Sequence, residues 1–68
     1  MSRQEIYETR LLIDVYRDVR NVWETEYERA KVCNPKFDET FRGQVILGCI
    51  EEINTEINGL RELLTDAV

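Results

Sequence analysis

Apolar residues recur in the second half of the chain at alternating steps of four and three residues. This spacing lines up seven side chains along one stripe of an α-helix, as in the heptad pattern of a coiled coil. A single helix in water gains little stability from such a stripe, so the stripe must pack against another helix. The pattern therefore predicts an all-α protein. The seven residues are Ile46, Ile50, Ile53, Ile57, Leu60, Leu64 and Ala67.

The first half of the chain supplies the second helix. Ser2 is followed three residues later by Glu5, a capping-box pattern that predicts a helix start near residue 3. No proline or glycine interrupts the sequence until Asn34-Pro35, a pair suited to end one helix and to open the next. A second apolar seam with the same spacing runs between these signals. Its members are Leu12, Tyr16, Val19, Trp23 and Ala30.

These signals predict one domain over residues 1–68, an antiparallel two-helix hairpin that resembles a coiled coil. We expect helix one over about 3–33, a tight turn at 34–35 and helix two over about 36–66. Such a turn sets the register between the two seams. It also places Glu26 on the seam opposite Gly43, where Arg29 or Arg42 could pair with the carboxylate. The expected core pairs are Leu12 with Ile57, Tyr16 with Ile53, Val19 with Ile50, and Trp23 with Ile46.

A chain of 68 residues buries only a small core, and chains of this size often add a disulfide, a metal or a partner subunit. A second apolar row flanks the seam of helix one, and two further residues lie on the matching flank of helix two. We expect this flank to form the interface of a homodimer, in which two hairpins make a four-helix bundle. Alternatively, it binds a different protein or is ordinary exposed surface. The flank comprises Leu11, Val15, Val22, Cys49 and Leu63.

Phe37, Phe41 and Val45 form a row with a spacing of four residues at the start of helix two. If the helix runs unbroken from residue 36, this row faces outward and is a partner-binding surface, because exposed aromatic residues often anchor interfaces. In the other arrangement, residues 36–43 leave the helical phase. Gly43 then breaks the helix, Asp38 caps it, and the rings fold back over the end of helix one.

The composition restricts the chemistry. The chain has no histidine and only two cysteines, Cys33 and Cys49, too far apart in the predicted hairpin to form a disulfide. This composition predicts no cofactor, no metal site and no catalytic activity. The net charge of −5 disfavours nucleic-acid and anionic membrane surfaces. The start of the chain shows no long apolar run, so we expect neither a signal peptide nor a membrane span, and a cytoplasmic protein with reduced thiols.

Three function classes remain. The favoured one is a small acidic regulatory or adaptor protein that acts by binding an unidentified protein, as expected from fold analogy with plasmid-copy-number regulators, export chaperones and phage-encoded inhibitors. The second is a nucleic-acid-related regulator, either an RNA-binding hairpin dimer or an acidic mimic of DNA. The third is a metal-dependent nucleotide hydrolase. It would use carboxylates that resemble the acidic helices of the all-helical nucleotide pyrophosphohydrolases: Glu24, Glu26, Glu28, Glu51, Glu52 and Glu56.

Overall fold

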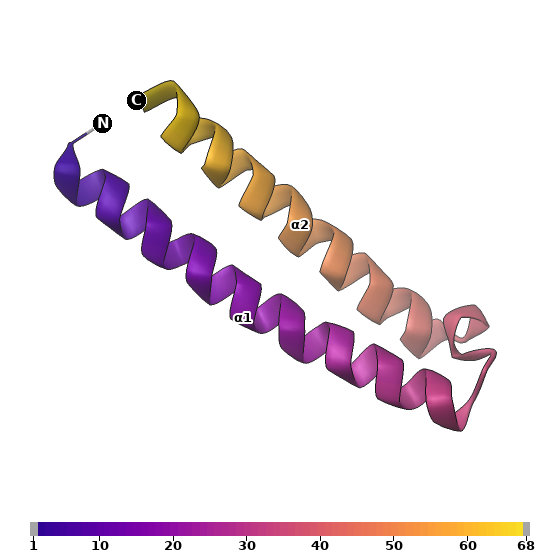
Figure 1. Cartoon of the computed structure of the whole chain (residues 1–68). Coiled ribbons are helices and arrows are strands. Elements are labelled where there is room, and N and C mark those ends of the chain that lie inside the picture. Colours follow the sequence, from indigo (N-terminus) through magenta and orange to yellow (C-terminus); the bar gives the residue numbers. More distant parts are fainter. Residues whose placement is uncertain (1, 68) are drawn as a thin grey trace.

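The computed structural model describes residues 2–67, without the side chains of residues 66 and 67, and it is a helical hairpin. Helix α1 (Arg3–Cys33) and helix α2 (Phe41–Ala67) lie side by side and antiparallel (Figure 1). A short 3-10 turn, η1 (Phe37–Glu39), belongs to the connection between them. The hairpin measures 47 × 15 × 13 Å. The all-helical fold with two long helices is thus confirmed.

Both ends of α1 agree with the sequence signals. The backbone N–H of Glu5 donates a hydrogen bond to Ser2 Oγ at 3.2 Å, so Ser2 caps the helix as its pattern predicts. At the other end, Asn34 is extended and its N–H donates to the carbonyl oxygen of Ala30 at 2.9 Å. The helix therefore ends at the residue before Asn34-Pro35, where proline disfavours the helical conformation of its predecessor.

The connection is longer than the predicted turn, and the expected start of helix two at residue 36 is wrong. Pro35 is the second residue of a turn that is closed by a 2.9 Å hydrogen bond from Phe37 N–H to the carbonyl oxygen of Asn34. The chain then forms η1, and Thr40 Oγ1 accepts the N–H of Gly43 at 3.0 Å. Thr40, rather than Asp38, is therefore the N-cap of α2, which begins at Phe41.

The seam of α2 lies where the heptad pattern predicts. Ile46 and Ile57 are buried. Ala67, the last predicted member, lies outside the described side chains. The other members are half-buried against α1, so six of the seven positions form the inner face of α2. The four half-buried members are Ile50, Ile53, Leu60 and Leu64.

Three of the five predicted seam residues of α1 lie on its inner face, but this face is turned so that Leu12 and Val19 are excluded from it. Leu12 and Val19, expected in the core, are 42% and 40% exposed, and Glu26 is exposed as well. The buried residues are Thr9 and Ile13, and Thr9 is satisfied by a 2.7 Å hydrogen bond to the carbonyl oxygen of Glu5. The residues of this face recur with heptad spacing. Because Thr9 and Arg20 among them are polar, a search for hydrophobic residues alone does not detect the face. Its half-buried members are Tyr16, Arg20, Trp23, Tyr27 and Ala30.

The register also differs from the prediction. Arg20 Nη1 donates a hydrogen bond to Asn54 Oδ1 at 2.8 Å, which fixes the two helices along their axes. Given which residues form the inner faces of α1 and α2, this hydrogen bond sets a register in which Tyr16 lies opposite Ile57 and Trp23 lies opposite Ile50. Each partner on α2 is four residues later than predicted, a shift of about 6 Å. The cause is the longer connection, which delays the start of α2 by several residues.

The turn end is closed by Phe37, which is 8% exposed. Its ring packs against Tyr27 with a centroid distance of 5.9 Å and an interplanar angle of 55°. Its backbone lies so close to Gly43 that a Cβ atom at Gly43 would overlap the Phe37 carbonyl oxygen. Gly43 is therefore a helical residue whose missing side chain lets the connection pack closely against α2, and it does not break the helix as predicted.

Candidate functional site

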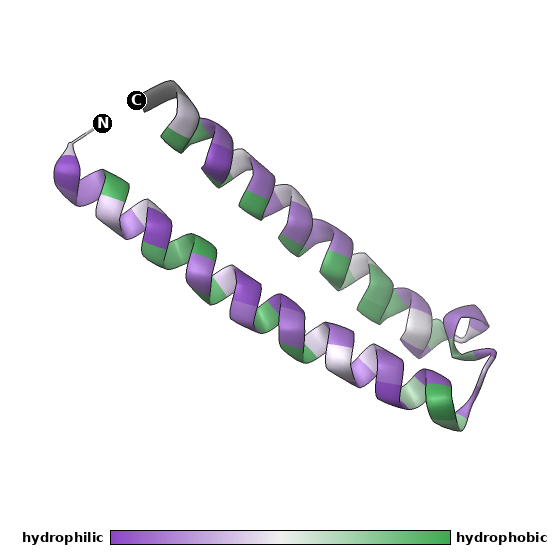
Figure 2. Ribbon diagram, viewed as in Figure 1, coloured by the Kyte–Doolittle hydropathy of each residue, from purple (hydrophilic) through white to green (hydrophobic). Residues whose placement is uncertain are grey.

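Four aliphatic residues form a largely exposed stripe along α1. The residues follow one another at steps of three, four and three, so they share one side of the helix. Between 40% and 63% of each side chain is exposed. Figure 2 shows hydrophobic residues recurring along the whole of α1. The stripe, called the apolar stripe below, consists of Leu12, Val15, Val19 and Val22.

Each residue of the apolar stripe directly precedes a residue of the inner face, so the stripe borders the packed seam. In an antiparallel helix pair, residues that precede the seam on both helices lie on the same side of the pair. The stripe and its neighbours on α2 thus form one surface, called the lateral face below. The neighbours on α2 are Cys49, Glu52, Glu56, Gly59 and Leu63.

The register determines which residues meet across the lateral face. Along the helix axes, Val19 is level with Glu56 and Val22 is level with Glu52. At the open end of the hairpin, by the same geometry, Leu12 is level with Leu63 and Val15 is level with Gly59. A Cβ atom at Gly59 would meet nothing within 4 Å, so the face has free space there. The lateral face is therefore apolar along α1 and acidic in the middle of α2.

The residues predicted for a dimer interface gather on this face, with one exception. Val15, Val22 and Leu63 are exposed on it, and Cys49 is half-buried along its edge. Leu11 is also exposed, but its helical position points it away from α2, at the outer border of the face. Leu12 and Val19 belong to the face although the sequence reasoning assigned them to the core. A search for two adjacent heptad stripes on one helix would have found them.

The three residues of the predicted partner-binding row are separated by the connection. Phe37 is buried against Tyr27 and is therefore unavailable to a partner, which corrects that prediction. Phe41, by contrast, is 86% exposed in the first turn of α2, and Val45 is exposed one turn later. The structure therefore supports the arrangement in which a ring folds back over helix one, but only for Phe37.

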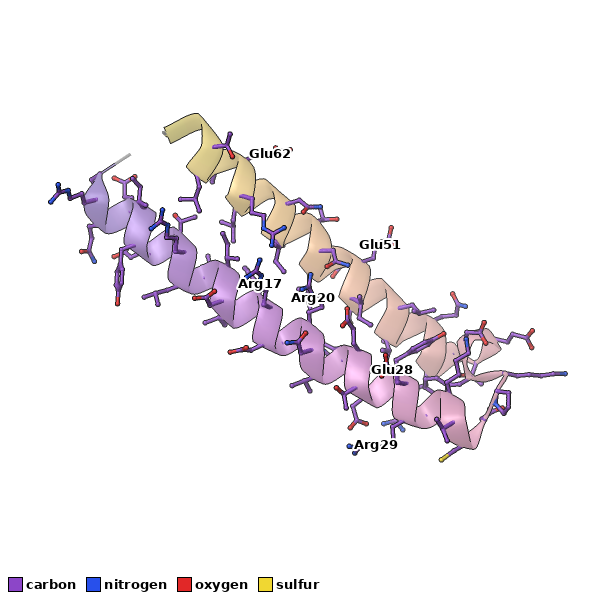
Figure 3. The ribbon with its side chains drawn as sticks, viewed as in Figure 1. Arg17, Arg20, Glu28, Arg29, Glu51 and Glu62 are labelled. Atoms are coloured by element: carbon purple, nitrogen blue, oxygen red, sulfur yellow. The ribbon has the colours of Figure 1, made fainter. Side chains whose placement is uncertain are left out.

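Glu52 and Glu56, the two glutamates of α2 on the lateral face, form no ion pair among the described residues. No lysine or arginine nitrogen lies within 4 Å of Glu52 or Glu56 among the described residues, whose ion pairs join Arg20 to Glu24 at 3.8 Å and Arg29 to Glu26 at 3.6 Å. Arg17 and Arg20 extend from α1 toward α2, whereas Glu51 and Glu62 point away from α1 (Figure 3). The middle of the lateral face therefore carries uncompensated negative charge.

Among the described side chains, the carboxylates do not gather into a metal-binding group. Over the described side chains, no three acidic or cysteine residues converge in a way that could hold a metal ion. Glu26, which the sequence placed on the seam, lies at the surface beside Arg29. Cys33 and Cys49 are both free thiols.

Comparison of the chain with protein-family models, curated proteins and solved structures found no match. Within residues 2–67, neither helix offers a stretch of sufficient length and apolar character to traverse a lipid bilayer.

Proposed function

We propose that this chain is a small regulatory or adaptor module that acts by protein–protein binding through its lateral face. The observation that carries the proposal is the exposure of four aliphatic residues along α1, on the same side of the helix pair as Leu63 and Cys49 of α2. Contiguous apolar surface of this kind marks interaction sites on small soluble proteins. Because α1 and α2 form a rigid scaffold, a partner helix could bind without refolding the hairpin.

The small core makes a partner energetically useful. Among the described side chains, the buried apolar residues are Ile13, Phe37, Ile46 and Ile57. Burial of the four residues of the apolar stripe would add about 1.5 kcal/mol or more for each side chain that becomes fully covered. Phe41 and Val45 supply a second, smaller contact near the turn in this proposal. The four-helix bundle of two hairpins remains a prediction for how the face is covered.

Affinity capture from the native host with matched variants tests the proposal. Val22→Asn changes the lateral face, and Val32→Asn makes the same replacement at an exposed residue near the end of α1, away from the stripe. Both variants should keep the helicity and the free energy of unfolding within about 0.5 kcal/mol. Only Val22→Asn should lose the captured protein. Equal capture by both variants would show that the lateral face is not the binding surface.

A further inference from the structure

Two glutamates of α2, Glu52 and Glu56, lie on the lateral face on the same side of the helix pair as the apolar stripe, and unlike Glu26 on α1 they have no paired arginine among the described residues. Glu56 is level with Val19 and Glu52 with Val22, in the middle of the lateral face. Neither has a cation within 4 Å among the described side chains. The exposed arginine nearest to them on the same face of α1, Arg29, is seven residues beyond Val22 and is already paired with Glu26. An occupant that covers the aliphatic residues must therefore also compensate these two carboxylates.

A second copy of the chain compensates them poorly. If two hairpins pack face to face with α1 against α1, then α2 lies against α2, and the glutamates of both copies meet in the same interface. If α1 packs against α2 of the other copy, Val22 of each copy meets Glu52 of the other. Each copy also carries a net charge of −5. Both arrangements bury carboxylates without a counter-charge, which is costly.

A basic helix meets the same requirements without this cost. The apolar stripe runs from Leu12 to Val22, ten residue steps or about 15 Å along α1, which matches about three turns of a partner helix. A shallow hollow beside Val22, lined by Asn21, Thr25 and Glu26, can receive an apolar side chain. Lys or Arg residues on one flank of that helix would reach Glu52 and Glu56, because flanking charges pair across helix interfaces.

We infer that the partner of the lateral face is a basic amphipathic helix, whose apolar side chains pack on the apolar stripe and whose Lys or Arg side chains pair with Glu52 and Glu56. The inference rests on the proposed protein-binding function, because it names the chemistry of the partner for the same face. It assigns a different role to each helix. The stripe on α1 supplies the apolar contact, and α2 supplies the preference for positive charge.

Two synthetic peptides of about 18 residues serve as probes. The lysine peptide has Leu at alternating steps of three and four and Lys along one flank of the Leu stripe. The glutamine peptide replaces each Lys by Gln. Fluorescence anisotropy measures the affinity of both peptides for the full chain. The wild-type chain should bind the lysine peptide about three- to tenfold more tightly than the glutamine peptide, and this preference should shrink when salt rises from about 0.05 M to about 0.5 M.

Two double variants locate the charge effect. Glu52→Gln with Glu56→Gln should abolish the preference for the lysine peptide. Glu51→Gln with Glu62→Gln removes the same charge from side chains that point away from α1, and should keep most of the preference (Figure 3). If both double variants lose the preference equally, the attraction comes from overall charge and the inference fails.

The remaining outcomes separate the inference from the proposed function. Equal affinity of the wild-type chain for both peptides would overturn the inference and leave protein binding by the apolar stripe intact. If neither peptide binds, and sedimentation equilibrium shows a dimer that Val15→Asn with Val22→Asn disrupts, a second copy covers the face and the inference is wrong. A monomer that binds neither peptide would overturn both the inference and the proposed function.

Discussion

Arg20 Nη1 donates a hydrogen bond to Asn54 Oδ1 at 2.8 Å and thereby joins the middle of α1 to the middle of α2. Arg20 occupies a seam position, where neighbouring layers are apolar or aromatic. Its Nε is buried and makes no hydrogen bond, although it lies 3.8 Å from Glu24 Oε1, close enough for an ionic interaction. A polar pair in an apolar seam favours one register, because a shifted register would leave Arg20 against aliphatic side chains.

The Arg20–Asn54 hydrogen bond can be isolated by comparing two asparagines of α2. Asn54→Ala should lower the free energy of unfolding by about 1–2 kcal/mol relative to Asn58→Ala, because only the first removes the hydrogen bond that Arg20 makes to α2. Both replacements gain the same helix propensity, so that contribution cancels. Urea denaturation measures the difference. Equal stability of the two variants would contradict the assigned register.

Gly43→Ala should destabilise the hairpin by about 2–3 kcal/mol, because the added Cβ would overlap the Phe37 carbonyl oxygen and force the connection away from α2. Gly48→Ala and Gly59→Ala are the controls. A Cβ at either position meets nothing within 4 Å, so each should stabilise the protein by about 0.5–1 kcal/mol through helix propensity alone. Thermal unfolding followed by circular dichroism measures all three, and a gain in stability for Gly43→Ala would refute the close approach.

Phe37→Ala and Phe41→Ala should differ strongly although the residues are only four positions apart. Phe37 is buried against Tyr27, and its truncation should cost about 2–4 kcal/mol. Phe41 is 86% exposed, so its truncation should change the free energy of unfolding by less than about 0.5 kcal/mol. Denaturant titration decides between this result and the opposite order, which would restore Phe37 to the outer surface.

Thr40→Ala should lower stability by about 1–2 kcal/mol, because Thr40 Oγ1 accepts the N–H of Gly43 at the start of α2. The same replacement at Thr55, an exposed residue inside α2, should be neutral or slightly stabilising. Hydrogen exchange of the first turn of α2 gives a second measure, since loss of the cap should accelerate exchange there. Equal effects at Thr40 and Thr55 would show that α2 does not begin at the cap assigned here.

Local signals were sufficient to predict the helices. Ser2 with Glu5 sets the start of α1, Asn34-Pro35 sets its end, and the isoleucine spacing of α2 identifies the face that α2 presents to α1. Each of these features acts within about one or two helical turns, or repeats without interruption along one helix. Sequence patterns therefore report them directly, and the all-helical fold with two helices follows from them.

The rotation of α1 and the register depended on contacts between residues far apart in the chain. Two heptad stripes overlap on α1, and the more hydrophobic one, with Leu12 and Val19, is the one left exposed. The burial of Phe37 over Tyr27, the space at Gly43 and the Arg20–Asn54 hydrogen bond together favour the other stripe. The sequence by itself determined which segments are helical. The tertiary structure decided which faces meet, because the free energy of packing depends on the fit between side chains that no local pattern contains.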